Sequence, residues 1–226
     1  MSRIMQKEIK SEMDDFFFAK DDLDFYHEYV HVEQIYLAGI KEVRTKLEIL
    51  DDEFHNRFSH NPIHHMEWRL KSPKSVVEKM KRRNLPVSVN SIKGNIEDIA
   101  GVRVICNYVK DIYRISDLLS RQDDINLLKI KDYIKNPKEN GYRSLHLVVE
   151  VPVYLAEEKK MVTVEIQIRT IAMDFWATLE HNLRYKNKNE VSDDIRKRLY
   201  DCAESITEID YEMEAIHNKL KGKYNI

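Results

Sequence analysis

Glycine, proline and cysteine are all scarce in this sequence, and each scarcity narrows the class of protein. The 226 residues contain only 5 Gly, 5 Pro and 2 Cys. So little glycine and proline favours long helices over a loop-rich β fold. No metal-type spacing links the two cysteines, which argues against a cysteine metal site. We expect Cys106 and Cys202 to be buried thiols in a reducing compartment, with a single disulfide between them as the alternative.

Long apolar runs and the common phosphate-binding and metal-binding motifs are also missing. The run Phe16-Phe17-Phe18 is far shorter than the ~20 residues that a membrane helix needs, and residues 1–15 lack the apolar stretch of a signal peptide. The sequence therefore predicts a cytoplasmic protein with no membrane partner. It contains no GxxxxGK[ST] loop, no GxGxxG loop and no HExxH helix. An enzyme that handles phosphates with this sequence must use another scaffold.

Neither sign of charge dominates. The sequence has 37 basic and 39 acidic residues, a net charge of −2, and 42% apolar against 34% charged residues. These proportions are typical of a soluble enzyme. The near balance gives no support for bulk binding to DNA or to a membrane, although a local basic patch can lie within it, so RNA binding stays open.

The apolar pattern changes twice along the chain. Residues 1–58 predict one or two amphipathic helices that end before the turn signal Asn61-Pro62, and residues 67–83 are interpreted as a further helix. The middle predicts an α+β core, a mixed β-sheet with helices. Its expected elements are strands at 101–106, 125–131, 144–151 and 161–169, a helix at 110–121 and a loop at 136–141.

Residues 190–222 predict a long helix with a heptad seam. Apolar residues recur there at alternating spacings of four and three, the pattern of a helix that packs along a narrow stripe. The stripe either packs on its own domain or joins subunits, and the sequence leaves both open. Its members are Ile195, Leu199, Cys202, Ile206, Ile209, Met213, Ile216 and Leu220.

Two segments carry polar residues suited to phosphate chemistry. From Arg69 to Arg83 there are seven basic residues and one acid, Glu78. Wound as a helix, this segment brings serines and cations onto one stripe, which suits a polyphosphate or a solvated surface. In the strand from Met161 to Arg169, alternation places Thr163, Glu165, Gln167 and Arg169 on one face. That face is either the polar floor of a site or a half-exposed sheet surface.

Single residues nearby extend this chemistry. Asp98 precedes the strand that begins near Gly101, where its carboxylate is placed to hold Mg²⁺ or to cap a helix. Arg103 projects from that strand, and its guanidinium suits stacking on a base or pairing with a carboxylate. In the loop at 131–146, Tyr142 suits stacking on a purine and Asn140 suits reading the edge of the base.

Four segments together resemble the synthetase domain of the Rel/Spo-type (p)ppGpp synthetases, specifically the small alarmone synthetases. They are RLKSPKSVVEKM (69–80), IEDIAGVRVIC (96–106), KDYIKNPKENGYRSLH (131–146) and VEIQIRTIAMDFWATLEH (164–181). The resemblance implies a nucleotidyltransferase-like mixed β-sheet flanked by helices, with N- and C-terminal helical extensions. It implies one synthetase domain over 1–226: N-terminal helices (1–58), a catalytic core (60–186) and a C-terminal helix (190–222). ATP and GDP or GTP are the implied substrates, Mg²⁺ is the implied cofactor, and a homotetramer is the implied assembly.

The resemblance also assigns roles to individual residues. Glu165 resembles the base that activates the guanosine 3′-hydroxyl, and Asp98 resembles the Mg²⁺ ligand, with Glu165 as a second carboxylate at the metal. The residues matched to ATP are Arg69 and Arg103, which sandwich adenine, and Lys71, Ser75 and Lys79, which hold its phosphates. The residues matched to GDP or GTP are Lys131, Lys138, Asn140, Tyr142, His146 and Gln167, with Tyr142 stacked on guanine. Residues 173–181 are expected to support the site.

The implied reaction moves the pyrophosphoryl group of ATP onto the 3′-hydroxyl of GDP or GTP and releases AMP. Because no paired His-Asp metal motif is present, hydrolase activity is not expected. Two alternatives remain open at this point: another nucleotidyltransferase, which would gather more carboxylates around paired metals, and a non-catalytic module that binds guanine nucleotides or RNA.

Overall fold

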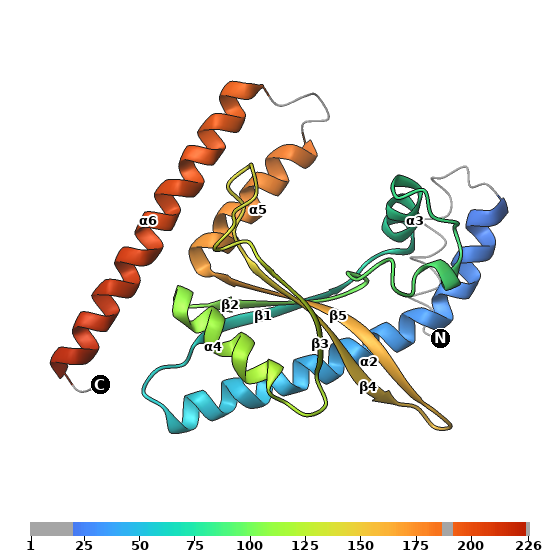
Figure 1. Cartoon of the computed structure of the whole chain (residues 1–226), viewed down its shortest axis with the longest axis horizontal. Helices are drawn as coiled ribbons and strands as arrows, with labels where there is room; N and C mark the ends of the chain where they lie inside the picture. The colour runs from blue at the N-terminus through green and yellow to red at the C-terminus, as the bar shows by residue number, and fades with distance from the viewer. Residues whose placement is uncertain (1–19, 187–191, 225–226) are drawn as a thin grey trace. The chain divides into compact units, whose positions relative to one another are not determined.

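The computed structural model describes residues 20–186 and 192–224, which form two compact units (Figure 1). Among these residues, the first unit holds 20–34 and Ser72–Ile96, and the second holds Ile35–Lys71 and the residues from Glu97 onward. Residues 1–19 of the predicted N-terminal helices lie outside the described residues. The rest of the predicted N-terminal helical region forms one helix, α2 (Lys20–Arg57). Its residues belong to both units.

The first unit contains the start of α2, the helix α3 (Pro73–Arg82) and the short 3₁₀ helix η1 (Val89–Ser91). Ser72 caps α3, because its hydroxyl accepts from the backbone N–H of Ser75 at 3.4 Å. Pro73 suits the first helical position, where the N–H that it lacks would have no intrahelical partner. The buried apolar side chains among the described residues of the unit are Phe25, Tyr29, Val76, Val77, Met80, Ile92 and Ile96.

The prediction of one helix over 67–83 is wrong. Residues Ile63–Leu70 form strand β1, and the helix begins only at Pro73. A proline disfavours helical geometry in the residue before it, so Ser72 is extended and separates the two elements. Arg69 therefore does not share a helical stripe with Ser75. The alternation of Met66, Trp68 and Leu70 with charged residues is a strand signal that could have identified β1.

A five-stranded mixed sheet forms the centre of the second unit, in the order β1-β2-β5-β4-β3. Strands β2 and β5 are parallel, and the other neighbours are antiparallel. The predicted α+β class and all four predicted strands are confirmed, with ends shifted by up to three residues. The strands are Ala100–Cys106 (β2), Asn126–Asp132 (β3), Leu145–Tyr154 (β4) and Lys159–Thr170 (β5), besides β1.

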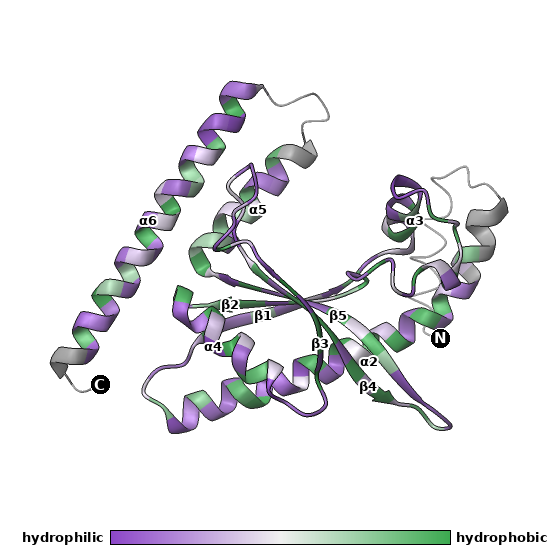
Figure 2. Ribbon diagram, viewed as in Figure 1, coloured by the Kyte–Doolittle hydropathy of each residue, from purple (hydrophilic) through white to green (hydrophobic). Residues whose placement is uncertain are grey.

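One face of the sheet packs against α2 and α4 (Val109–Ser120) and forms the core (Figures 1 and 2). The buried alternate residues of the strands meet apolar side chains at helical spacing, Ile40, Val43 and Leu47 on α2 and Ile112 and Ile115 on α4. α2 lies very close to β5 at Gly39, where an added Cβ would come within 2.6 Å of a Val162 methyl carbon. Because α2 and α4 cover this apolar face, the polar residues of the strands lie on the opposite face of the sheet.

The C-terminal helices are α5 (Ile171–Lys186) and α6 (Asp193–Tyr224). Trp176 of α5 donates from its indole N–H to the carbonyl of Leu199 at 3.0 Å, in a cluster that includes Ala203 and Ile206. Further along α6, Asp210 accepts from the hydroxyl of Thr170. These contacts place α6 beside α5 and the sheet.

The heptad seam is mostly not the face on which α6 packs. Of its eight members, Leu199 and Ile206 are half-buried, whereas six are exposed: Ile195, Cys202, Ile209, Met213, Ile216 and Leu220. The expectation that Cys202 is buried is therefore wrong, because its side chain lies on this exposed stripe, whereas Cys106 is buried in the sheet. Both thiols are free.

No helix within 20–186 or 192–224 is long and apolar enough to cross a membrane.

Candidate active site

A row of polar side chains crosses all five strands on the face opposite α2 and α4. Strand residues alternate between faces, so residues paired across neighbouring strands point to the same side. The backbone register aligns, from β1 to β3, Glu67, Arg103, Gln167, His146 and Lys131. Glu165 lies two residues before Gln167 and shares its face. The predicted alternation of β5 is confirmed, since Val164, Ile166 and Ile168 lie in the core.

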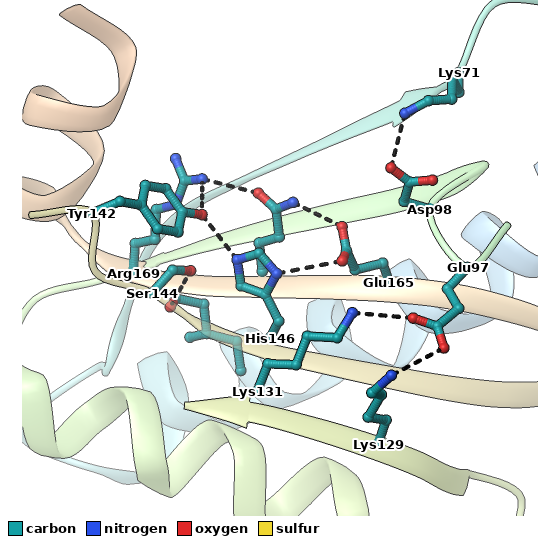
Figure 3. Close-up of polar contacts among 12 residues, drawn as sticks. Lys71, Glu97, Asp98, Lys129, Lys131, Tyr142, Ser144, His146, Glu165 and Arg169 are labelled. Atoms are coloured by element: carbon teal, nitrogen blue, oxygen red, sulfur yellow. Dashed lines mark hydrogen bonds and ion pairs between the residues drawn. The ribbon is translucent and has the colours of Figure 1, made fainter. Parts of the chain in front are cut away.

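The Glu165 carboxylate is held by two side chains at the centre of this face (Figure 3). The Gln167 amide donates to Oε2 at 2.8 Å, and Nδ1 of His146 lies 3.3 Å from Oε1. Glu165 is only 8% exposed, so the carboxylate is largely shielded from water. It therefore depends on these two neighbours for its orientation.

Arg169 begins two chains of hydrogen bonds that both end at Glu165 (Figure 3). In one chain, its Nη2 donates to the side-chain oxygen Oε1 of Gln167 at 3.0 Å, and the Gln167 side-chain NH₂ donates onward to the carboxylate. In the other, Nη2 donates to the Tyr142 hydroxyl at 2.6 Å, and that hydroxyl lies 2.8 Å from Nε2 of His146. Four side chains thus converge on one carboxylate.

The Glu165 carboxylate assigns the protons. An ionised carboxylate can only accept, so Nδ1 of His146 carries a hydrogen and donates to Glu165. In the neutral imidazole Nε2 then carries no hydrogen, so it accepts from the Tyr142 hydroxyl, whose oxygen accepts from Arg169.

The pKa directions of the central pair agree with this assignment. Burial raises the pKa of Glu165, but the hydrogen bond and charge of His146 and the Gln167 amide outweigh it, and the pKa lies below its ordinary value. Burial lowers the pKa of His146, against the opposing effect of Glu165. At neutral pH the carboxylate is ionised and the imidazole is neutral. A nearby polyphosphate would raise the pKa of Glu165 toward that of a more effective base.

A pocket lies beside Glu165, toward β1 and β2. Asp98, just before β2, accepts from the Lys71 ammonium at 2.8 Å. Asp98 and Glu165 both line the pocket, and carboxylate oxygens are ligands that Mg²⁺ prefers. Among the described residues no group of three or more potential metal ligands is present, so these two carboxylates fit an ion that takes its other ligands from substrate phosphates. The lining residues are Glu67, Trp68, Arg69, Asp98, Gly101, Val102, Arg103, Glu165 and Gln167.

The two arginines predicted to sandwich adenine both line this pocket. Arg69 lies on β1 opposite Gly101 in the backbone register. Arg103 lies on β2, and its Nη1 is 3.1 Å from a Glu67 oxygen and 3.6 Å from Oδ1 of Asp174. Its Nε is buried and finds no hydrogen-bond partner among the residues that the structure describes. The arginines share a pocket wall, and Arg103 is held there by two carboxylates.

Of the predicted acceptor residues, Gln167 lines the pocket itself, whereas Tyr142 and His146 lie on the side of Glu165 away from Asp98 (Figure 3). The Lys138 ammonium lies 4.6 Å from the centre of the Tyr142 ring. Burial lowers the pKa of Lys138, and the charges of Arg169 and Lys131 lower it further against the opposing effect of Glu165. Because the Lys138 ammonium lies over the Tyr142 ring, the two groups form a continuous surface. That surface is suited to a base and its phosphates.

Asn140 and Lys131 complete this side. The Asn140 amide donates to Glu180 of α5 at 3.1 Å, and its Oδ1 accepts from the Tyr142 backbone. Lys131 of β3 pairs with Glu97 at 3.0 Å (Figure 3). Gly141, between Asn140 and Tyr142, has φ +87°, and a Cβ there would come within 2.6 Å of the Ala203 side chain. Only glycine therefore fits this turn against α6.

The structure thus brings together most of the predicted site residues. Ser75 and Lys79 lie on α3 of the first unit, so their role as ATP phosphate ligands stays a prediction. The sequence placed Arg169 on the polar face without a role. It gave Asp174 none, although the segment at 173–181 was expected to support the site. Neither residue has a local signal beyond its charge, because each also acts through a partner distant in sequence, Tyr142 for Arg169 and Arg103 for Asp174.

The comparisons with known proteins identify the family. Residues 68–190 match the region found in RelA and SpoT proteins. GTP pyrophosphokinase YwaC of Bacillus subtilis is 42% identical over 186 residues, which cover 82% of this chain and 89% of YwaC.

Solved structures agree. Small alarmone synthetase 1 of Bacillus subtilis bound to its product pppGpp superposes with a TM-score of 0.80 at 34% identity, covering 86% of this chain and 98% of that one. The same enzyme bound to AMPCPP gives a TM-score of 0.73 at 30% identity with the same coverage. The family match, the identity and the shared fold together show that the chain belongs to the RelA/SpoT family, among its small alarmone synthetases.

Proposed function

We propose that this protein transfers the pyrophosphoryl group of ATP to the 3′-hydroxyl of GDP or GTP and releases AMP. The observation that carries the proposal is the position of Glu165. Its ionised carboxylate lies between a pocket suited to a nucleotide donor and a surface of Tyr142, Lys138 and His146 suited to an acceptor. The relatives are pyrophosphokinases, and one related enzyme binds both AMPCPP and pppGpp.

On the donor side, Arg69 and Arg103 would hold adenine, and Lys71 would meet the phosphates. Lys71 pairs with Asp98, which lines the pocket, so its ammonium lies beside the pocket. Asp98, together with Glu165, would hold Mg²⁺. When bound, the ion neutralises charge on the donor phosphates. Ser75 and Lys79 of α3 are proposed as further phosphate ligands.

On the acceptor side, guanine would stack on Tyr142, and Asn140 would contact the edge of the base. Lys131 and Lys138 provide positive charge for the 5′-phosphates, and burial of Lys138 strengthens that interaction. His146 and Gln167 fix the Glu165 carboxylate.

The chemical step follows from this arrangement. The guanosine 3′-oxygen attacks the β-phosphorus of ATP as its proton passes to Glu165. The bond between the β-phosphorus and the oxygen bridging to the α-phosphorus breaks, and AMP leaves with that oxygen. Positioning of the two reactants supplies much of the rate, because the attack becomes intramolecular in effect.

Product analysis tests the proposal. The protein is incubated with ATP, GDP and MgCl₂, and nucleotides are separated by anion exchange and identified by ³¹P NMR. We expect equal amounts of AMP and of guanosine carrying a 3′-pyrophosphate. Release of pyrophosphate in place of AMP would indicate another nucleotidyltransferase, and binding without turnover would indicate a non-catalytic module.

We also propose a homo-oligomer, a tetramer, in which the exposed seam of α6 joins subunits. Ile209 and Met213 are 59% and 52% exposed in the single chain, so the stripe is available to a second copy. Apolar residues in such a continuous stripe are costly in water, which favours association. We further propose a cytoplasmic location, synthesis without hydrolysis, and residues 60–186 as the catalytic core.

A further inference from the structure

Asp174, in the first turn of α5, lies between two arginines that belong to different halves of the site. Its Oδ1 is 3.1 Å from Nη1 of Arg169 and 3.6 Å from Nη1 of Arg103. One carboxylate oxygen is therefore shared by the two guanidinium groups. The Asp174 side chain is only 19% exposed, so these interactions are weakly screened by water.

Arg169 depends on this carboxylate. Its side chain is 6% exposed, and Asp174 is the only acidic residue with which it forms an ion pair in the described part of the chain. A buried cation that loses its only anion is strongly disfavoured. Because both hydrogen-bond chains to Glu165 begin at Arg169, Asp174 holds the start of each chain.

Arg103 interacts with the same Asp174 oxygen, but Asp174 is not its only carboxylate partner. It also pairs with Glu67, at 3.1 Å, and it lines the pocket proposed for adenine. If Arg103 turned to stack on a base, it would withdraw from Asp174 and leave the full charge of Asp174 to Arg169. The tighter pair would then fix Tyr142 and Gln167 around Glu165.

We propose that Asp174 is a positioning residue that couples the two nucleotide sites, so that a donor nucleotide at Arg103 orders the acceptor side through Arg169. The inference rests on the proposed function for the identity of the two nucleotides. Coupling of this kind is reciprocal, so the acceptor must tighten donor binding by the same factor.

Calorimetry on the full chain measures the coupling directly. The dissociation constant of GDP is determined with MgCl₂, with and without a saturating α,β-methylene analogue of ATP, in which the bond that breaks is blocked. In wild type we expect the analogue to tighten GDP binding by roughly 5- to 150-fold, the usual range for coupled sites. In Asp174→Asn the ratio should fall to about one, while Asp174→Glu, which keeps the carboxylate, should restore part of it.

Asp117→Asn is the matched control, because that exposed carboxylate pairs with Arg121 within α4 and should leave the ratio unchanged. A purely structural role for Asp174 would weaken each nucleotide alone and leave the ratio intact, and that result would overturn the proposal. A wild-type ratio of one would overturn it as well.

A second variant covers the case in which Asp174→Asn does not fold. Arg103→Gln leaves Arg169 its partner but removes the donor-side contact, so its ratio at saturating analogue should also fall toward one. A wild-type ratio in Arg103→Gln would overturn the proposal. If wild type shows coupling but makes no pyrophosphorylated guanosine, the proposed function fails while the coupling through Asp174 stands.

Discussion

The Tyr142 hydroxyl lies 2.8 Å from Nε2 of His146 and donates to it, because the neutral imidazole carries its hydrogen on Nδ1, toward the Glu165 carboxylate. The tyrosine therefore contributes a proton to the site as well as an aromatic face. Tyr142→Phe keeps the face for guanine but leaves Nε2 of His146 without this donor. The change removes two hydrogen bonds, and the one to His146 acts on the base. Its loss, ~0.5–1.5 kcal/mol, predicts turnover about two- to tenfold slower with GDP affinity near wild type.

Steady-state and binding measurements separate the two contributions. Tyr142→Ala should additionally lose ~1–3 kcal/mol of GDP binding, because the stacking surface is gone. Tyr133→Phe is the matched control, since the Tyr133 ring also contacts His146 edge-on. Wild-type turnover in Tyr142→Phe would show that the hydroxyl chain plays no part in catalysis.

Changes on the donor side should weaken the affinity for ATP selectively. Arg103→Ala removes one face of the proposed adenine sandwich, and cation–π stacking contributes ~0.5–2 kcal/mol. The dissociation constant of ATP should rise about two- to thirtyfold, while GDP binding measured without ATP should not weaken. Exposed Arg121→Ala should change neither. Equal losses for both nucleotides would remove Arg103 from the donor site.

Much of the fold follows from local patterns. The alternation from Val162 to Ile168 defines both faces of β5, because a strand buried on one side must alternate. Strand β1 was missed because the basic residues from Arg69 onward suggested a continuous helical stripe. Pro73 and the pairing of β1 with β2 divide this segment into two elements, the strand β1 and the helix α3.

The site is less accessible to sequence reasoning than the fold. The roles of Glu165 and Asp98 came from the resemblance, and local patterns alone left them open. The chain from Arg169 through Tyr142 to His146 joins side chains of β5, β4 and the preceding loop. Their proximity depends on strand register, which no single segment encodes. For the same reason the shared position of Asp174 emerges only when α5 is placed beside β2 and β5.

Assembly through α6 is tested by charge on the exposed seam. Ile209→Asp together with Met213→Asp places two carboxylates on the stripe without disturbing the face that packs on α5. Burying them at a subunit contact would cost several kcal/mol, so light scattering should show a smaller species with an unchanged circular dichroism spectrum. Glu208→Asp with Glu212→Asp serves as the control. An unchanged mass for the seam variant, or a monomeric wild type, would show that the seam joins no subunits.

The stability of the contact between α6 and Thr170 at the end of β5 should depend on pH, because that contact includes the carboxyl group of Asp210. Burial raises the pKa of this carboxyl, the charge of Glu214 raises it further, and the Thr170 hydrogen bond opposes both. A raised pKa in the folded state means that stability is present below the unfolded pKa and is lost as the pH rises through the folded value. Asp210→Asn keeps an acceptor for Thr170 without the buried charge.

The Asn variant should therefore melt above wild type at pH 8, and the difference should shrink as the pH is lowered toward 5. Thermal melts at both pH values check this, with exposed Asp201→Asn as the control. A difference in melting temperature that is independent of pH would show that Asp210 is not charged in the folded protein at pH 8.

The sharpest prediction concerns the carboxylate on which both hydrogen-bond chains converge. A ribose hydroxyl is a poor nucleophile at neutral pH, so its proton must be accepted as the bond to phosphorus forms. Glu165→Gln preserves volume but removes the base, and turnover should fall by ~10²–10⁴-fold. Binding of GDP should change little, because it does not depend on proton transfer, and ATP binding should weaken only in part, because Asp98 still holds Mg²⁺. Asp98→Asn should also lose turnover, but with weaker ATP binding that no longer responds to Mg²⁺. Single-turnover rates and calorimetry separate the two variants. A Glu165→Gln protein that makes product at near wild-type rate would falsify the role of Glu165 as the base.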